Sequence, residues 1–206
     1  MITAWRSMRF VFLAALSPAF FATAAERPGD WTGNYPPCGR SADLLNRNRM
    51  DLGVRLSTSN RELSAAFARA MDFWSGILDM GWHLEDGRNC AIQIVDGEPG
   101  LFKPAEAARA QFPGSPAFQG WIAFNPRITL SADELFSLAI HEIGHVLGLP
   151  HSPNTHSVMY FLALDGPVFL DDGDLAALAA HHKLRGAGPW SDSLRVDFDA
   201  LVRSAQ

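Results

Sequence analysis

The 206-residue chain predicts an α+β fold with about five strands and two long helices. Short runs with β-strand patterning alternate along the chain with two longer runs of helical apolar periodicity. Apolar residues make up 48% of the sequence, which is enough to bury a sizeable core. The roughly 180 residues that follow an N-terminal leader suit one compact domain, and we see no internal repeat.

The first strand is expected at Met50–Ser57, followed by a long helix at about Asn60–Asp79. Apolar residues recur along this helix at the spacing of a buried stripe. The stripe consists of Leu63, Phe67, Ala70, Met71, Trp74, Ile77 and Leu78. Four short strands should follow, near Trp82–Glu85, Cys90–Val95, Ala107–Phe112 and Gly120–Asn125.

Two more helices complete the expected fold. Ser131 with Glu134 three residues later forms a capping box that begins the second long helix. A last helix is expected at about Gly173–Lys183. It places His181 and His182 near its C-terminal end, where cationic groups interact favourably with the helix dipole.

The run from His141 to His151 reads HEIGHVLGLPH and carries most of the chemical information. His141 and His145 lie one turn apart on the same face of a helix, so both rings can reach one zinc ion. Glu142 lies roughly 100° around the helix, where it can reach a metal-bound water instead. His151 can join the pair only if the chain leaves the helix. Gly148 is the residue that permits this turn.

Three histidines leave one tetrahedral position of zinc open, as in catalytic sites, whereas structural sites are usually closed by four protein ligands. The alternative is a pair of histidines packed on a helix without a metal, because the five-residue pattern alone can arise by chance. The further match of Gly148 and His151 argues against that alternative.

The run HEIGHVLGLPHS resembles the zinc signature of the matrixins, a group of metzincin metallopeptidases. Ser157 to Tyr160 resembles the metzincin Met-turn, which implies that Met159 packs beneath the zinc site and that Tyr160 also supports the site. Ala108 to Gly114 resembles the matrixin strand that pairs with substrate. The resemblance implies a metzincin-like domain at 50–206, with a twisted mixed sheet and a small C-terminal subdomain after the zinc site.

Two features of matrixins are expected to be missing. The strand positions of their structural-zinc histidines correspond here to Arg109 and Ala123, neither of which binds zinc. Their acidic calcium-binding positions correspond to Asn125 and Pro126. We therefore expect one catalytic Zn²⁺ and can identify no Ca²⁺ ligands, although calcium binding stays open.

The resemblance implies a zinc-dependent endopeptidase that cleaves a protein or peptide substrate. Zinc would activate a water molecule, and Glu142 would act as the general base. The substrate would pair with the edge strand near Ala107–Phe112. The apolar residues 161–164 predict a preference for an apolar side chain just beyond the cleaved bond. The alternative is a catalytically latent or non-proteolytic zinc-binding module with the same fold.

Residues 1–24 have the features of a secretory signal peptide: Arg6 and Arg9, an apolar stretch, and an A-x-A site at Ala22 to Ala24. Residues 25–49 would then form a short N-terminal segment. The mature chain would have 15 basic and 22 acidic residues, a net charge of −7 that argues against nucleic acid as a partner. We expect a secreted or periplasmic monomer without stable membrane association.

Cys38 and Cys90 are the only cysteines. In an oxidising compartment they predict a disulfide, which would stabilise the fold by about 4 kcal/mol in the chain-entropy model. The alternative is a cysteine switch, because Pro37-Cys38-Gly39 with Asp43 faintly resembles the matrixin latency motif. That motif's arginine is absent here, and too few residues precede Cys38 for a folded prodomain.

Overall fold

A computed structural model describes residue 31 and residues 50–87, 90–115, 117–161 and 169–185. The elements follow in the order β1 (Met50–Ser57), α1 (Arg61–Ile77), β2 (Met80–Leu84), β3 (Ile92–Asp96), η1 (Pro99–Leu101), β4 (Ala108–Ala110), β5 (Trp121–Phe124), α2 (Ala132–Val146) and α3 (Asp172–His181). The α+β prediction is therefore confirmed. The predicted signal peptide and Cys38 lie outside the described residues.

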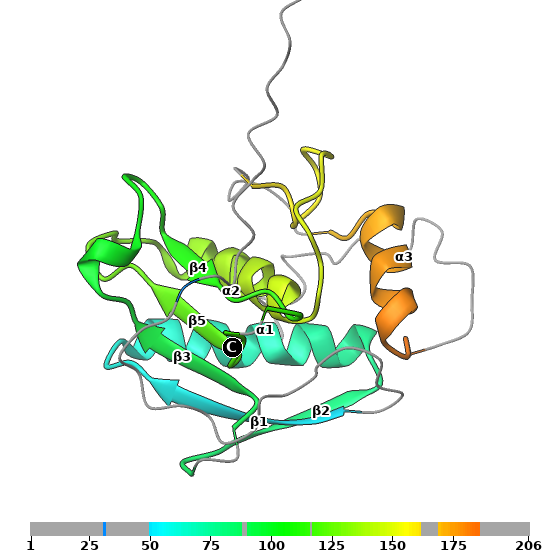
Figure 1. The fold of residues 1–206 in the computed structure, drawn as a ribbon, viewed down its shortest axis with the longest axis horizontal. Coiled ribbons are helices and arrows are strands. Elements are labelled where there is room, and N and C mark those ends of the chain that lie inside the picture. The colour runs from blue at the N-terminus through cyan, green and yellow to red at the C-terminus, as the bar shows by residue number, and fades with distance from the viewer. Residues whose placement is uncertain (1–30, 32–49, 88–89, 116, 162–168, 186–206) are drawn as a thin grey trace, which may run out of the picture.

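Five strands form one mixed sheet in the order β2-β1-β3-β5-β4 (Figure 1). The β1–β2, β1–β3 and β3–β5 pairs are parallel, and only β4 runs antiparallel to its neighbour β5. In this order β4 is an edge strand, at the place where the sequence predicted a substrate-pairing strand. It is shorter than the predicted Ala107–Phe112.

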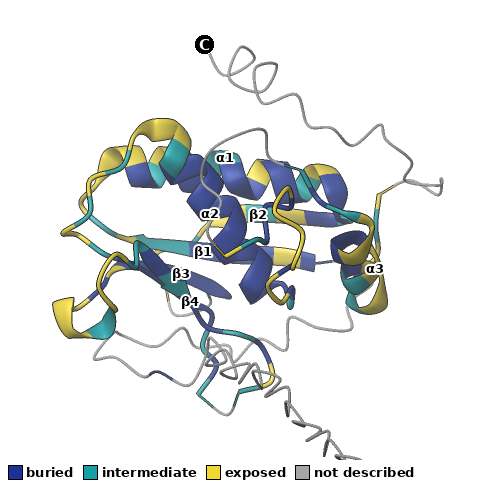
Figure 2. Cartoon of the chain, turned by 90° about the horizontal axis from the view of Figure 1, so that it is seen from above, coloured by how far each residue is buried: buried dark blue, intermediate teal, exposed yellow. Residues whose placement is uncertain are grey.

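Helices α1 and α2 lie on the same side of the sheet and enclose the main core (Figures 1 and 2). All seven residues of the predicted stripe on α1 are buried. Asn60 caps this helix, because its side chain accepts a hydrogen bond from the backbone N–H of Leu63. The indole Nε1–H of Trp74 donates to the carbonyl of Ile140 at 3.2 Å, which ties α1 to α2.

The capping box predicted at Ser131 is present, and α3 begins with a second capping box that was not predicted. Ser131 and Glu134 exchange hydrogen bonds at the start of α2, as expected. Asp171 and Asp174 do the same at the start of α3. These caps satisfy backbone N–H groups that have no partner inside the helix.

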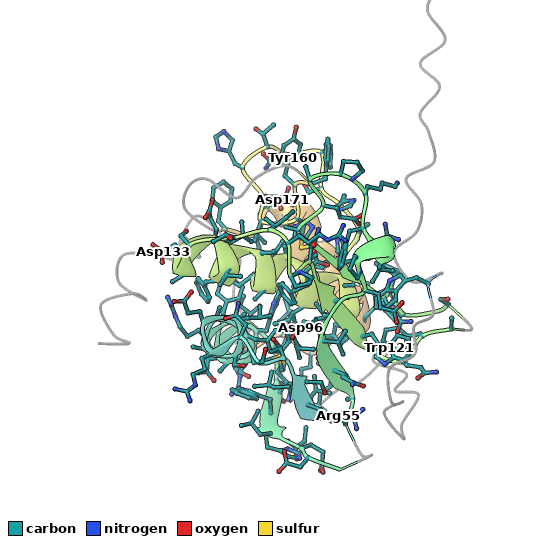
Figure 3. The ribbon with its side chains drawn as sticks, turned by 90° about the vertical axis from the view of Figure 1, so that its left-hand side faces the viewer. Arg55, Asp96, Trp121, Asp133, Tyr160 and Asp171 are labelled. Atoms are coloured by element: carbon teal, nitrogen blue, oxygen red, sulfur yellow. The ribbon has the colours of Figure 1, made fainter. Side chains whose placement is uncertain are left out.

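A second, smaller apolar cluster covers the other face of the sheet. It contains Trp31, Val95, Trp121 and Ala123, with Leu101 and Phe102 packed against it. Trp121, labelled in Figure 3, lies on the side of the sheet away from α1. Residue 31 belongs to the segment that was predicted to precede the folded domain.

Candidate metal centre

His141 and His145 lie one turn apart on α2 and are both buried, with exposures of 8% and 3%. Their ring planes are nearly perpendicular, at 87°, with centroids 4.6 Å apart. The Nε2 atoms of the two rings approach to 3.1 Å. The helix thus presents two imidazole nitrogens to one point in space.

His151 returns to the same point because the chain leaves the helix at Gly148. Gly148 has a φ of +100°, the left-handed conformation in which glycine has no steric penalty. The N–H of Leu149 donates to the carbonyl of Gly144 at 2.9 Å and closes the turn. The Nε2 atom of His151 then lies 3.2 Å from that of His145.

The outer ring nitrogens show which tautomer faces the cluster. His141 Nδ1 lies 2.6 Å from the carbonyl of Val158, and His145 Nδ1 lies 2.8 Å from the carbonyl of Leu149. A carbonyl only accepts, so Nδ1 carries the hydrogen in both rings and Nε2 presents a lone pair. The Nε2 atoms therefore face one another as acceptors rather than as a donor and an acceptor.

This arrangement fits a zinc ion. Ligand nitrogens about 2.0–2.1 Å from a tetrahedral zinc are about 3.3 Å apart, close to the separations found here. Among the described residues, the three histidines form the one group of three or more potential ligands that could hold a metal ion. The donor set, the tautomers and the separations all agree with zinc.

Burial keeps these rings neutral. It lowers the pKa of His141 to about 4, against a weaker upward effect of the Val158 carbonyl. Burial also lowers the pKa of His145 well below its usual range, and it lowers the pKa of the more exposed His151. Neutral imidazole is the form that binds metal, so protons compete little for this site near neutral pH.

Glu142 follows His141 on the helix and is also buried, at 5% exposure. Burial, and then the negative charge of Glu106, raise its pKa to about 8, whereas a backbone hydrogen bond from Ala110 and the charge of Arg109 act in the opposite direction. A cation at the histidine cluster would also favour the carboxylate form. Glu142 therefore lies between the metal-binding group and the edge strand β4.

Met159 is fully buried beneath the histidine cluster. A Cβ atom at Gly144 would lie 2.6 Å from its Sδ atom, so the glycine of the HEIGH run is what lets the methionine approach α2. The turn is closed by a 3.0 Å hydrogen bond from the N–H of Tyr160 to the carbonyl of Ser157. Tyr160 is half-buried and its ring lies 5.0 Å from that of Phe161.

Two serines in the loop after α2, which carries His151 and Met159, are hydrogen-bonded to the start of α3. We did not predict these contacts from the sequence. The hydroxyl of Ser152, next to His151, donates to Asp171 at 2.8 Å. The hydroxyl of Ser157 donates to the buried Asp174. Tyr160 and Asp171 accordingly lie at the same end of the molecule (Figure 3). The available signal was the pair of acidic residues three apart at the start of α3, Asp171 and Asp174.

Arg109 and Ala123, the positions of the missing structural-zinc histidines, are directly paired between β4 and β5. The guanidinium of Arg109 makes two hydrogen bonds of 2.9 Å to the carboxylate of Glu106. Ala123 is fully buried. Neither residue offers a metal ligand, and the absence of a zinc ion between these strands stays a prediction.

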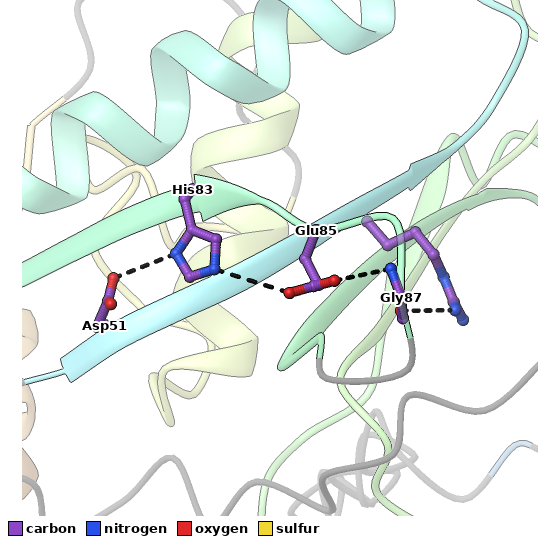
Figure 4. A network of polar contacts seen from close by, with 5 residues as sticks. Asp51, His83, Glu85 and Gly87 are labelled. Carbon is purple, nitrogen blue, oxygen red and sulfur yellow. Dashed lines mark hydrogen bonds and ion pairs between the residues drawn. The ribbon is translucent and has the colours of Figure 1, made fainter.

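The remaining histidines lie outside the cluster. His156 is exposed, and its ring stacks on Phe169 at 5.9 Å. His83 lies on β2 in an exposed polar network with Asp51 and Glu85, which also accepts from the N–H of Gly87 (Figure 4). This network joins β1, β2 and the turn after β2.

The cationic interpretation of His182 was wrong. His182 ends α3 as its C-cap and is buried, and its Nε2–H donates to the carbonyl of Leu147 at 2.7 Å. Burial lowers its pKa, with a smaller contribution from the nearby charge of His181. A neutral His182 thus joins the end of α3 to the end of α2.

Cys90 is fully buried and disulfide-bonded. Because Cys38 lies outside the described residues, its pairing with Cys90 stays a prediction. Residues 162–164 of the predicted substrate pocket also lie outside the described residues. No helix in the described part of the chain is long and apolar enough to cross a membrane.

A helix with two metal-facing histidines, a third histidine after a glycine turn and a methionine beneath them define a metzincin-like site. A model of the Matrixin family matches residues 54–182, more than half of the chain. The chain therefore belongs to the matrixin family, as the zinc signature indicated.

Individual relatives are more distant. Stromelysin-2 of Rattus norvegicus is 28% identical over 160 residues, which cover 71% of this chain and 33% of that protein. Metalloendoproteinase 2-MMP of Arabidopsis thaliana is 30% identical over 135 residues, covering 55% and 35%. Matrix metalloproteinase-17 of Homo sapiens is 30% identical over 172 residues, covering 72% and 26%. The chain thus spans about a third or less of the length of these relatives.

Proposed function

We propose that the protein is a zinc-dependent endopeptidase. The observation that carries the proposal is the convergence of three imidazole Nε2 atoms, with separations of 3.1 and 3.2 Å from His145, beside the buried carboxylate of Glu142. The names of the relatives, which include metalloendoproteinase and matrix metalloproteinase, support the same activity.

His141, His145 and His151 would hold the zinc ion. When bound, zinc supplies Lewis acidity, which acidifies a water molecule and polarises the carbonyl of the scissile bond. Glu142 accepts a proton at its carboxylate as water attacks and passes that proton to the leaving amine. The two Nδ1 hydrogen bonds hold the ligand rings in place, since outer partners of this kind fix the ring orientation.

The free side of β4 supplies the surface for an extended peptide. The N–H of Gln111 donates to the carbonyl of Trp121, and the N–H of Asn125 donates to the carbonyl of Ala107. Hydrogen-bonded pairs alternate in antiparallel strands, so the backbone groups of Ala108 and Ala110 point away from β5. The N–H of Ala110 already donates to Glu142, so a substrate strand can pair with the backbone groups of Ala108 and with the carbonyl of Ala110.

Phe161 is the described residue best placed to contact a substrate side chain. It is 60% exposed, although it is a large apolar residue. Its ring centroid lies 6.2 Å from that of His151. We propose that it forms part of an apolar wall for the substrate residue just beyond the cleaved bond.

The signal-peptide features support export, and we propose that the mature protein acts on protein or peptide substrates as a secreted or periplasmic monomer. The acidic composition supports the absence of a nucleic acid partner. The alternative of a latent or non-proteolytic zinc-binding module shares the metal site but predicts no cleavage.

The deciding experiment compares the wild type with Glu142→Gln on a quenched peptide library, with zinc content measured for both. We expect one zinc per chain in both proteins and a loss of about 10²- to 10⁴-fold in kcat/KM in the variant. Asp133→Asn, an exposed acid on the same helix, is the control and should keep full activity. Zinc without cleavage by the wild type would favour the alternative, and equal activity in Glu142→Gln would remove the proposed base.

A further inference from the structure

Trp31 is buried in the folded domain although it lies 19 residues before β1. Its ring centroid lies 5.6 Å from that of Trp121 on the outer face of the sheet. Val95 and Ala123 complete the buried part of this cluster. The ring therefore covers β3 and β5 on the side that neither α1 nor α2 covers.

The backbone of Trp31 is bonded to the residue that follows the edge strand. Its carbonyl accepts a hydrogen bond of 3.0 Å from Nε2 of Gln111. The same nitrogen donates to the carbonyl of Ala117 at 2.9 Å. The amide oxygen of Gln111 accepts from the N–H groups of Gln119 and Trp121, at 2.8 and 3.2 Å. All four hydrogen-bonding positions of this fully buried amide are thus used.

Gln111 connects this contact to the catalytic side of the edge strand. It directly follows Ala110, whose backbone is hydrogen-bonded to Glu142. Its side chain also closes the connection between β4 and β5, because it holds residues 117, 119 and 121. A strand of three residues has few ladder bonds of its own, so such outside contacts decide how firmly it is held.

We propose that Trp31 is a permanent part of the mature domain and positions β4 from the outer face of the sheet. The folded domain then includes Trp31 and does not begin at Met50. Trp31 is a positioning residue: it acts through Trp121 and Gln111 and touches no reacting atom. Its predicted effect on peptide cleavage rests on the proposed peptidase function, whereas its effect on β4 does not.

The first test is amide hydrogen exchange of the full exported chain carrying Trp31→Ala. We expect exchange in residues 108–121 to become at least about tenfold faster while exchange in α2 and the zinc content stay unchanged. Trp31→Phe should restore most of the protection, because it keeps an aromatic ring against Trp121. Trp82→Ala is the matched control, since Trp82 lies on β2 at the opposite edge of the sheet. Unchanged exchange in residues 108–121 of Trp31→Ala would overturn the proposal.

Kinetics provide the second readout. In Trp31→Ala, β4 should be held less firmly, so KM should rise several-fold. The change in kcat should be smaller, because the zinc ligands and Glu142 lie on α2 and the following loop. A fall in kcat at unchanged KM would contradict the positioning role. If the wild type cleaves nothing, the proposed function fails, but the exchange experiment still tests whether Trp31 positions β4.

The N-terminus of the protein isolated after export gives a third, independent result. We expect sequencing to place it between residues 25 and 31, so that Trp31 is retained. Fully active protein that begins after Trp31 would overturn the proposal.

Discussion

Gly144 and Met159 are in direct contact beneath the metal centre: a methyl group added to Gly144 would lie 2.6 Å from Sδ of Met159 and 3.3 Å from Cζ2 of Trp74. Both neighbours are fully buried. The glycine between the two helix histidines therefore sets the distance between α2 and the turn that carries Met159. Helix, turn and core must fit together for the ligand rings to converge.

Gly144→Ala should lower the free energy of unfolding by about 1–3 kcal/mol, the usual cost of inserting a methyl group into a packed core. We also expect weaker zinc binding, because displacing Met159 moves Val158, whose carbonyl orients His141. Thermal unfolding and zinc titration measure the two effects. The control is Gly76→Ala in α1, where nothing lies within 4 Å of the added methyl group. It should stabilise the protein by about 0.4–1 kcal/mol. Equal effects of the two substitutions would contradict the packing argument.

Zinc should stabilise the folded protein through the three histidines. At a free concentration 100 times the dissociation constant, zinc should add about 2.7 kcal/mol to the free energy of unfolding. His145→Ala should abolish most of this gain, since losing even an outer partner of a metal ligand weakens binding by about 10- to 100-fold. His156→Ala should keep the full gain, because His156 lies outside the cluster. Melting curves with zinc and with a chelator measure both. A zinc-dependent shift that survives in His145→Ala would place the metal elsewhere.

His182 predicts an acid sensitivity of the contact between α3 and α2. Its pKa is lowered in the folded protein by burial, so the unfolded chain binds the proton more readily. The contribution of His182 to stability is therefore full above the ordinary histidine pKa of about 6.5 and is lost as the pH falls through the lowered pKa.

His182→Gln keeps an N–H donor for the carbonyl of Leu147 but removes this titration. Below pH 6.5 the free energy of unfolding should fall less steeply in the variant, by at most about 1.4 kcal/mol per pH unit. Denaturant unfolding at several pH values, with metal-free wild type and variant measured in parallel, isolates the effect, since the other histidines are common to both. Parallel curves for the two proteins would show that His182 does not titrate in this range.

The sequence predicted the elements well where one local signal was sufficient. The bounds of β1 were correct, and the predicted Ser131 capping box marks a helix start that propensity alone leaves uncertain. Strand ends were less accurate: β2 begins at Met80 rather than near Trp82. The register with β1 sets that start, because Met50 pairs with Met80, and a partner strand is not visible in local sequence.

In the candidate site, too, the local features were predictable from the sequence and the tertiary contacts were not. Spacing along α2 and the glycine turn predicted which histidines converge, because both are local properties of the backbone. The Ser152–Asp171 and Ser157–Asp174 bonds join residues 17 to 19 positions apart through tertiary packing. His182 reaches Leu147 across 35 residues. No periodicity in the sequence indicates such partners. This explains why the hydrogen bonds of Asp171 and Asp174 to the two serines, and the burial of His182, were not predicted.

Phe161 and Leu84 are the two large apolar residues with the greatest exposure in the described chain, at 60% and 61%. Only Phe161 lies beside a proposed zinc ligand, His151. Phe161→Ala should therefore reduce kcat/KM for peptides with a large apolar residue just beyond the cleaved bond. Losing contact with most of one such side chain corresponds to about 1–3 kcal/mol, or roughly 5- to 150-fold. Peptides with a small residue there should be affected much less.

Stability should change little in either variant, because each side chain is mostly exposed and leaves no cavity when it is shortened. Leu84→Ala is the matched control: it removes similar exposed apolar surface from β2, at the opposite edge of the sheet from β4. Its kcat/KM should equal that of the wild type for every peptide in the set. If Phe161→Ala slowed cleavage of all peptides equally, Phe161 would act on the position of the proposed zinc ligand His151 and would not contact the substrate. Separate kcat and KM values across the peptide series distinguish these two roles.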